Sequence, residues 1–472
     1  MSGDSGALWT KGATELAEMI ARREVSSRDV VRAHLERIDA VNGHLNAVVR
    51  RLDDSALAAA DAADELLARA GSPVGPLHGV PFTVKENIDV AGTPTTSGVP
   101  ALAHAIAERD APVVERMRAA GGIPIARTNL PDLGLRVHTN SSLHGLTRNP
   151  WHPDHTSGGS SGGEGSALAS GMSPIGLGND IGGSLRNPAH CCGVSSIKPS
   201  AGVIPWATDI PPTALGAASQ LMLSEGVMAR RIADVRLGFD IVRGAHPRDP
   251  FSVSAELRDL PSERPLRIAV SAEYPGGATD PQIAAVVRAA AATLTDFGHE
   301  VTEVDPPDVA GTIEMWSAIM NNDLVVMLPL LETVLGEQAR QFLGFGREAF
   351  PHLDQAGMTY LHTQRFDLAR QWSEWFDDYD VLLSPTWALP AFEHDFDVRG
   401  MTEALRVFET FRPVLFANLF GSPAAVVPAG MAHGLPVGVQ VSSWRYRDQL
   451  CLTVAGLIDE SMGLATPIDP RR

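Results

Sequence analysis

Two serines and one lysine stand where flexible backbone could bring them together. Ser160 and Ser184 each follow a pair of glycines in the stretch TSGGSSGGEGSALASGMSPIGLGNDIGGSLR, residues 156–186, and Lys85 ends the apolar run GVPFTVK. Amide hydrolysis needs a nucleophile, a base that activates it, and hydrogen-bond donors for the oxyanion that forms. Two serines and a lysine could supply the nucleophile and the base without a histidine.

The glycines before Ser184 predict the oxyanion donors. Glycine lets the backbone turn so that several N–H groups point toward one position. The segment DIGGS therefore predicts an oxyanion hole formed by the backbone N–H groups of Ile181, Gly182, Gly183 and Ser184.

Lys85 can act as a base only if its pKa is lowered toward neutrality. Burial with few counter-charges lowers the pKa of a lysine, and Val80, Phe82 and Val84 give Lys85 apolar neighbours in the sequence. Ser160 would then relay a proton between Lys85 and the nucleophile. Lys85 and the two GGS sequences can also be explained without catalysis. A lysine after a strand is more often solvated, and a GGS sequence is more often a turn.

Two other motifs offer alternatives to this interpretation. The sequence GGSSG at 158–162 matches the G-x-S-x-G elbow of α/β-hydrolases, but that motif needs a buried strand before it, and NPWHPDH at 149–155 is not a strand pattern. Such a hydrolase would depend on a histidine or aspartate rather than on Lys85. No Gly-Lys-Ser or Gly-Lys-Thr follows the glycines, so a phosphate-binding loop is not predicted.

The composition excludes several function classes. The chain has 472 residues, 44% of them hydrophobic, and a net charge of −18, which indicates a globular protein and disfavours nucleic acid or an anionic membrane surface as a partner. Three cysteines are too few for a disulfide framework, and neither a metal nor an organic cofactor is predicted. The first residues lack the pattern of a signal peptide, and no apolar stretch is long enough to span a membrane. We therefore expect a cytoplasmic location.

The elements that must position these residues follow an α/β pattern. Strands that alternate with helices predict a sheet covered by helices, and no linker or repeat divides the chain. We expect helices over 12–70, 113–119, 283–294, 312–378 and 450–458, and strands over 77–85, 123–126, 266–270, 300–304, 379–386 and 438–441. The glycine-rich stretch 139–205 could be mistaken for a linker, but apolar residues recur through it.

These segments together resemble the amidase signature family. The resemblance is carried by GVPFTVKEN at 79–87, the TSGGSSGGEG…GNDIGGSLRNPAHCCGVSSIKPS stretch at 156–200, YDVLLSPT at 379–386 and GSPAAVVPAG…GLPVGVQV at 421–441. It implies one large α/β domain over 1–472, with a mixed β-sheet core covered by helices on both faces. The helical segment at about 1–70 would pack on that core.

The resemblance also implies roles for single residues. Ser184 corresponds to the acylated nucleophile, Ser160 to a bridging serine that follows a cis peptide bond, and Lys85 to the base. Supporting residues that hold the loop and the oxyanion N–H groups would be Ser161, Asp180 and Arg186. The implied reaction is cleavage of linear amides through an acyl-enzyme, with no cofactor.

The sequence departs from the common pattern of the family at several positions. Asn179 and Ile181 stand where many members have Ser or Thr, Glu164 replaces a common Ser, and Ser157 stands where Pro is frequent. Ile181 and Glu164 are more similar to the fatty-acid-amide and aryl-amide branches than to the glutamine amidotransferase A subunit. That subunit remains an alternative, which predicts glutaminase activity and a stable partner. A non-catalytic binding protein would require damage to the Lys-Ser-Ser set, which is intact.

Apolar residues beyond the serines predict the substrate pocket. Ile204, Trp206 and Leu221 flank a proline-rich loop, and Trp316 lies on an expected helix. These side chains would line an apolar acyl or aryl pocket, with core packing as the alternative. The expected substrate is a small apolar or aryl amide, and esters and carbamates (urethanes) would undergo the same first step. The sequence leaves a homodimer open.

Overall fold

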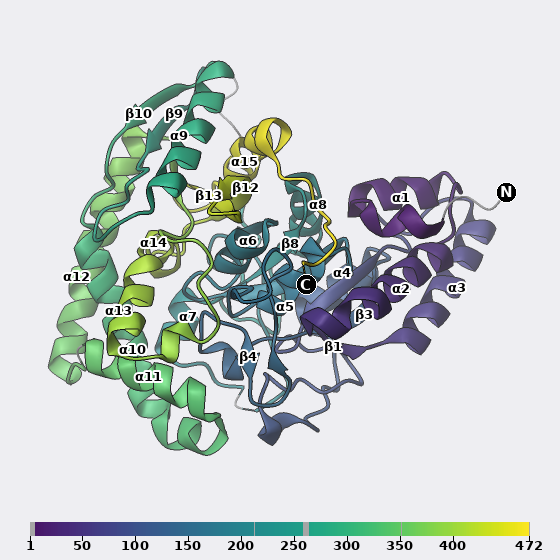
Figure 1. The fold of residues 1–472 in the computed structure, drawn as a ribbon, viewed down its shortest axis with the longest axis horizontal. Coiled ribbons are helices and arrows are strands. Elements are labelled where there is room, and N and C mark those ends of the chain that lie inside the picture. The colour runs from purple at the N-terminus through teal and green to yellow at the C-terminus, as the bar shows by residue number, and fades with distance from the viewer. Residues whose placement is uncertain (1–4, 212, 258–263, 351, 472) are drawn as a thin grey trace.

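A mixed β-sheet of eleven strands runs through the computed structural model, which describes residues 5–211, 213–257, 264–350 and 352–471 (Figure 1). The strand order is β1-β3-β2-β6-β8-β7-β12-β13-β11-β9-β10. The strands are β1 Val48–Arg51, β2 Pro81–Lys85, β3 Ile123–Thr128, β6 Ile175–Asp180, β7 Ser195–Lys198, β8 Ser224–Ala229, β9 Arg267–Val270, β10 Glu300–Glu303, β11 Val381–Pro385, β12 Ala424–Ala432 and β13 Leu435–Ser442. A separate two-stranded ribbon is formed by β4 Asn140–Ser141 and β5 Gly145–Leu146.

Parallel pairing of β2 and β6 places the loops that follow these two strands next to each other. Strands β3, β2 and β6 are parallel neighbours, as are β11, β9 and β10, whereas the strands from β6 through β8, β7, β12 and β13 to β11 pair antiparallel. Val84 of β2 is level with Leu177 of β6. The loops that follow Lys85 and Asp180, the last residues of these two strands, therefore leave the sheet at the same edge.

Helices cover both faces of the sheet, as the resemblance predicted. Neighbouring strand residues point to opposite faces. Val227 and Val427 pack in one core cluster with α8 and α15, and Met228 and Val426 pack in another with α5 and α6. The longer helices are α1 Ala13–Ala21, α2 Ser27–Leu45, α3 Asp53–Ala70, α4 Pro112–Ala119, α5 Gly162–Ala169, α8 Ile232–Val242, α9 Pro281–Asp296, α10 Val309–Val334, α11 Glu337–Ala349, α12 Gln355–Asp378, α13 Met401–Thr410 and α15 Asp448–Met462.

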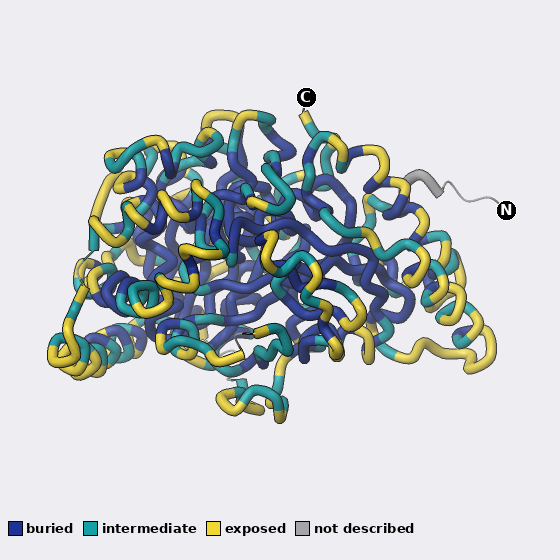
Figure 2. Tube along the Cα trace, turned by 90° about the horizontal axis from the view of Figure 1, so that it is seen from below, coloured by how far each residue is buried: buried dark blue, intermediate teal, exposed yellow. Residues whose placement is uncertain are grey.

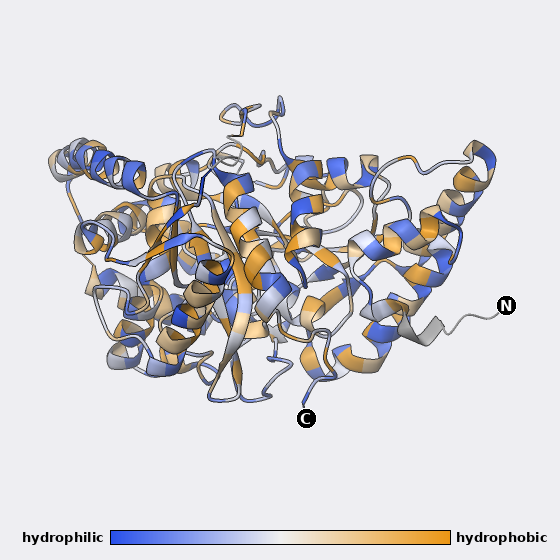
Figure 3. Ribbon diagram, turned by 90° about the horizontal axis from the view of Figure 1, so that it is seen from above, coloured by the Kyte–Doolittle hydropathy of each residue, from blue (hydrophilic) through white to orange (hydrophobic). Residues whose placement is uncertain are grey.

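Shorter helices connect these layers. They are α6 Arg186–Cys192, α7 Ala217–Met222 and α14 Leu415–Leu419, with 3-10 turns at Ser5–Thr10, Pro100–Leu102, Asp132–Gly134, Phe396–Val398 and Arg412–Val414. In Figure 1 the helices α1–α3 gather at one end of the molecule and α10–α13 at the other. Figure 2 shows the buried chain running through the middle between exposed outer segments. The helices in Figure 3 carry both hydrophobic and hydrophilic residues, as expected for elements that pack on a core with one side.

The largest difference from the expected elements lies in the glycine-rich stretch. Residues 156–200 are almost entirely buried and contain α5, β6, α6 and β7, elements that were not expected there; the expectation that this stretch is not a linker is confirmed. Strand β1 interrupts the expected N-terminal helices, and β8 and β12 were also missed. The expected βαβ unit is confirmed as β9, α9 and β10, with its strands parallel. Among the described residues, no helix is both long and apolar enough to cross a bilayer.

Candidate active site

Three elements bring Lys85, Ser160 and Ser184 to the edge of the sheet. Lys85 is the last residue of β2, Ser160 lies in the loop before α5, and Ser184 lies between β6 and α6. The peptide bond from Gly159 to Ser160 is cis, and Gly183 has a φ of 99°, a left-handed conformation that glycine adopts without steric cost. Lys85 is 0% exposed, whereas Ser184 keeps 8% of its surface accessible.

Lys85 contacts Ser160 directly, and Ser184 is held next to them through the backbone of Ser161. The Nζ atom of Lys85 lies 2.7 Å from the Oγ atom of Ser160. The backbone N–H of Ser161 donates to the carbonyl of Ser184 over 3.1 Å, which holds the two serine loops together. Ser160 and Ser184 both line one cavity of about 280 Å³, which we call the catalytic cavity.

Burial lowers the pKa of Lys85, as a lysine that acts as a base requires. Loss of hydration lowers the pKa of Lys85 to about 7, although the acidic groups Glu225, Asp180 and Glu164 act in the opposite direction. Near neutral pH a large fraction of Lys85 is therefore an uncharged amine with a free lone pair. An exposed lysine would be almost entirely protonated at that pH.

Two of those acids are partly uncharged near neutral pH, because they are buried as well. Burial raises the pKa of Glu225 to about 8 and the pKa of Glu164 to about 7. The hydroxyl groups of Thr83 and Thr128 donate to the Glu164 carboxyl. Partial neutralisation of these carboxyls reduces the counter-charge that would otherwise keep Lys85 protonated. No local pattern in the sequence indicates that Glu225 lies near Lys85.

Asn179 is the second partner of the lysine. Its Oδ1 atom lies 2.7 Å from Lys85 Nζ. A carboxamide oxygen can only accept a hydrogen bond, so an uncharged Lys85 directs one N–H toward Asn179. Its lone pair is then available to the hydroxyl of Ser160. In the sequence Asn179 stood out only as a departure from the common pattern.

The structure differs from the expected oxyanion hole at one N–H group, that of Gly183. The N–H of Gly183 donates to Asp180 Oδ1 over 2.8 Å, so this group supports the loop instead of facing substrate. Ile181, Gly182 and Ser184 line cavities, and in the described part of the chain no protein acceptor is found for their N–H groups. These three N–H groups fit the oxyanion role.

The expected supporting residues form a buried network behind the loop. Arg186 Nη2 lies 2.9 Å from Asp180 Oδ1, and both side chains are fully buried. Burial raises the pKa of Asp180, but the Arg186 guanidinium and the Gly183 and Asn418 hydrogen bonds outweigh this effect and hold that pKa well below its usual range. Asp180 also accepts from the N–H of Leu185, so it fixes both sides of Ser184.

Asp180→Ala is therefore expected to destabilise the fold strongly. It leaves the Arg186 charge buried without its carboxylate, which costs about 3–5 kcal/mol of unfolding free energy. Urea unfolding followed by circular dichroism measures this loss. The control is Asp367→Ala, which breaks an exposed pair with Arg370 and should change stability by less than about 1 kcal/mol. Similar losses for the two variants would contradict the role of Asp180.

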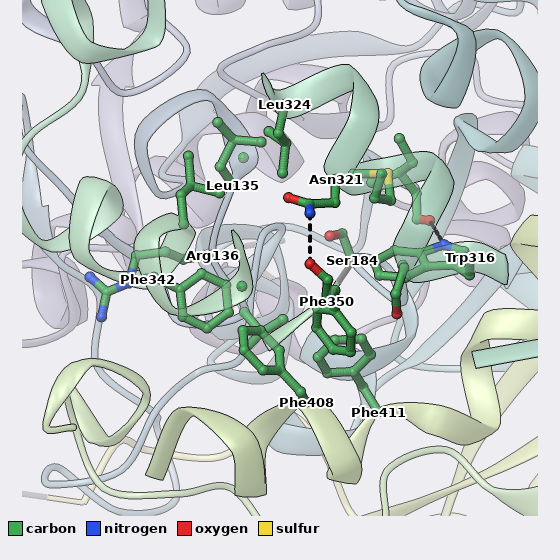
Figure 4. A pocket seen from close by; sticks show the side chains of 18 residues that line it. Leu135, Arg136, Ser184, Trp316, Asn321, Leu324, Phe342, Phe350, Phe408 and Phe411 are labelled. Atoms are coloured by element: carbon green, nitrogen blue, oxygen red, sulfur yellow. Dashed lines mark hydrogen bonds between the residues drawn. The ribbon is translucent and has the colours of Figure 1, made fainter. Parts of the chain in front are cut away.

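A second cavity of about 110 Å³ opens on Ser184 and is lined mainly by aromatic and aliphatic side chains. We call it the aromatic cavity. Figure 4 shows the Phe rings gathered on one side of Ser184, with Trp316 beside it and the Arg136 guanidinium directed away. That guanidinium pairs with the buried Asp397 instead. The aromatic lining residues are Trp316, Phe342, Phe350, Phe408 and Phe411.

The expected pocket residues fall into two groups. Trp316 lines the aromatic cavity and donates through Nε1 to the carbonyl of Ile181 over 3.1 Å, and Trp206 lines the catalytic cavity. Ile204 and Leu221 line a neighbouring cavity of about 380 Å³ that contains neither serine but shares Trp206 with the catalytic cavity, so their place in the substrate pocket stays a prediction. The four phenylalanines were missed, because they come from two helices and the residues just after them and form no local motif.

Known proteins match nearly the whole chain in sequence and in structure. A family model described as Amidase matches residues 29–452. The chain is 40% identical over 465 residues to an indoleacetamide hydrolase of Bradyrhizobium diazoefficiens, covering 97% of this chain and 88% of that protein. It is 36% identical over 457 residues to an acylamidase of Rhodococcus erythropolis, covering 94% of each. A bacterial aryl acylamidase structure aligns with a TM-score of 0.83 at 26% identity, over 96% of this chain and 97% of that one.

Proposed function

The chain belongs to the amidase signature family, and from that premise we propose that it hydrolyses small amides with an aromatic group through Ser184, Ser160 and Lys85. The observation that carries the proposal is the 2.7 Å contact between Lys85 Nζ and Ser160 Oγ at a cavity shared by both serines. The aromatic cavity beside Ser184 supports the aryl preference. The names of the relatives, an indoleacetamide hydrolase and an acylamidase, point to the same substrate class.

In the proposed reaction, uncharged Lys85 accepts the proton of Ser160 while Ser160 accepts the proton of Ser184. Ser184 Oγ attacks the amide carbon, and the oxyanion is stabilised by the N–H groups of Ile181, Gly182 and Ser184. Ser160 then gives a proton to the leaving nitrogen, and the C–N bond breaks.

The product of this first step is an ester between the acyl group and Ser184. Water attacks that ester and its proton passes through Ser160 to Lys85. The bond between the acyl carbon and Ser184 Oγ then breaks, the proton returns through Ser160 to Ser184 Oγ, and the carboxylic acid leaves. Aryl esters and carbamates would enter the same first step, and the carbamic acid released from a carbamate would lose carbon dioxide afterwards.

A substrate panel tests the proposal. We expect an aryl amide such as indole-3-acetamide or 4-nitroacetanilide to be hydrolysed with a kcat/KM at least about tenfold above that of a fatty amide, and glutamine to be inert. An aryl carbamate and an aryl ester complete the panel. Hydrolysis of glutamine alone would favour the amidotransferase subunit, and hydrolysis of the fatty amide alone would contradict the aryl preference.

Phe408→Ala tests whether the aromatic cavity holds the ring. Phe408 contacts Phe342, Phe350 and Phe411, with ring centroids 5.1, 5.2 and 6.0 Å away. Its removal should cost about 1–2 kcal/mol of aryl-amide binding, seen as a roughly tenfold higher KM with little change in kcat. The matched control is Phe366→Ala, an exposed phenylalanine on α12. Equal kinetics for the two variants would place the ring elsewhere.

A further inference from the structure

An indole N–H contacts the peptide unit that joins Ile181 to Gly182. Trp316 Nε1 donates to the Ile181 carbonyl over 3.1 Å, a bond drawn as a dashed line in Figure 4. Among the described residues this carbonyl has no other hydrogen-bond donor. The same peptide unit carries the Gly182 N–H, one of the three groups that fit the oxyanion role.

The peptide units on either side are held by different residues. In the unit before, the carbonyl of Asp180 accepts from Asn418 Nδ2 over 3.2 Å. In the unit after, the N–H of Gly183 donates to the Asp180 carboxylate. Neither bond involves an atom of the unit between them. The buried network around Asp180 therefore leaves the orientation of the middle unit to Trp316.

Gly182 allows this middle unit to turn. Turning one peptide unit mainly changes ψ of the residue before it and φ of the residue after it, and glycine accepts either sign of φ. The φ of Gly182 is not left-handed, so the backbone conformation does not itself require a glycine. A Cβ at this position would lie 2.6 Å from Trp316 Cζ2, which is too close. The approach of the indole thus requires a glycine, and its hydrogen bond restrains the freedom that the glycine brings.

The indole is compatible with only one orientation of the unit. Its nitrogen is a donor only, and the C=O and N–H groups of a trans peptide point in opposite directions. With the carbonyl toward Nε1, the Gly182 N–H points away from the indole, whereas a turned unit would set two donors against each other. Packing holds the ring itself: Trp316 is 9% exposed and meets Phe411 edge-on, with ring centroids 5.8 Å apart. An indole has one polar atom, so it cannot turn together with the peptide and restore the bond.

We propose that Trp316 is a positioning residue for the oxyanion hole: its N–H holds the Ile181 carbonyl, so that the Gly182 N–H faces the oxygen of the reacting carbonyl. Trp316 acts through this peptide unit and transfers no proton. It also lines the aromatic cavity, so one side chain contributes both to ring binding and to oxyanion stabilisation. This inference rests on the proposed function, because it takes Ser184 as the nucleophile.

The test compares two esters that differ only in the atom on which the negative charge develops. They are 4-nitrophenyl phenylacetate and its thiono analogue, in which sulfur replaces the carbonyl oxygen. In both, Ser184 Oγ attacks the acyl carbon and 4-nitrophenolate leaves. With enzyme in excess over ester, the release of this product gives kcat/KM of even a slow acylation.

The ratio of the two rates isolates the oxyanion hydrogen bonds. Sulfur accepts hydrogen bonds more weakly than oxygen, so donors that stabilise an oxyanion raise kcat/KM of the oxygen ester above that of the sulfur ester. The phenyl ring is common to both esters, so a change in ring binding cancels. For wild type we expect a ratio well above one.

Removal of the indole N–H should lower this ratio. Replacement of Trp316 by benzothienylalanine, introduced by amber suppression, exchanges the N–H for sulfur while the fused ring stays and no charge changes. We expect kcat/KM of the oxygen ester to fall about tenfold, less than for loss of a whole oxyanion donor, and that of the sulfur ester to fall less than about twofold. Trp316→Phe should shift the ratio in the same direction. A role in packing alone would lower both rates by the same factor.

Trp387 provides the matched control. It packs on the same loop, because a Cβ on Gly183 would lie 3.1 Å from Trp387 Cζ3, and it is equally buried. Its Nε1 has no hydrogen-bond partner among the described residues. Benzothienylalanine at position 387 should therefore leave both rates within about twofold of wild type. An equal drop in the ratio at both positions would contradict a specific role of the Trp316 N–H.

The outcomes separate this inference from the proposed function. If wild type cleaves neither ester, or if Ser184→Ala cleaves them equally fast, the assignment of the nucleophile is wrong and the inference falls with it. If cleavage depends on Ser184 but the ratio is unchanged in both Trp316 variants, the positioning role is overturned and the hydrolase stands. Should Trp316→Phe lose its fold by circular dichroism, the ratio measured for the benzothienylalanine protein decides alone.

Discussion

Ser184→Ala is expected to lower the hydrolysis of every accepted substrate at least about 1000-fold, because it removes the hydroxyl that we propose forms the acyl-enzyme. The side chain lies in a loop fixed by Asp180 on one side and by the Ser161 N–H on the other. Loss of one hydroxyl leaves these contacts in place. The variant should therefore fold and unfold like wild type while it neither hydrolyses substrate nor accumulates an acylated form in the mass spectrum.

Ser219→Ala is the matched control for this substitution. Ser219 lines the same catalytic cavity from α7 but makes none of the contacts that position Lys85 or Ser160. Its activity should stay within about twofold of wild type. If Ser184→Ala kept a tenth of the activity, or if wild type showed acylation at another residue, the nucleophile would have to be reassigned.

The three residues of the proposed reaction stand out in the sequence because their signals are local. Two glycines precede each serine, and an apolar run precedes Lys85, so backbone freedom and burial can be read from adjacent positions. The strands around them were harder to predict. Strand β6 carries Gly176 and Gly178 and is buried on both faces, so it lacks an alternation of apolar and exposed polar residues, and Ile175 is its only β-branched residue.

The surroundings of the reacting residues could not be predicted, because they are built by contacts between distant segments. Glu225 reaches Lys85 only because β8 pairs with β6. Phe342 and Phe408 meet because α11 packs near α13. The donor role expected of Gly183 failed for a different reason: the carboxylate three residues earlier takes its N–H, which glycine patterns alone do not indicate.

Lys85→Met is expected to lose activity and gain stability in the same experiment. Without a base, proton removal from Ser184 through Ser160 stops, and the rate should fall by about 100- to 10,000-fold. In wild type the activity should rise with pH through about 7, because the uncharged lysine is the active form and burial lowers the pKa of Lys85 to about 7. A flat wild-type profile between pH 6 and 9 would contradict this assignment.

The stability gain follows from the sign of the same pKa shift. The lysine pKa is about 7 in the folded protein and 10.5 when exposed, so between these values the unfolded chain binds more protons than the folded one. The buried lysine then destabilises the fold increasingly as pH falls from 10.5 to about 7, by about 1.4 kcal/mol per pH unit. Methionine fills similar space without that cost, so the variant should be about 2–5 kcal/mol more stable at pH 7.

The measurement compares urea unfolding of Lys85→Met, Lys11→Met and wild type at pH 7, with kcat/KM from the same preparations. Glu225 has a pKa raised to about 8 and is mostly uncharged at that pH, which limits its own contribution to the comparison. Lys11 is partly exposed and pairs with Glu15, so its substitution should leave activity unchanged and alter stability by less than about 1 kcal/mol. A folded but less stable Lys85→Met would mean that Lys85 stays charged in the native protein, and the base would then have to be sought elsewhere.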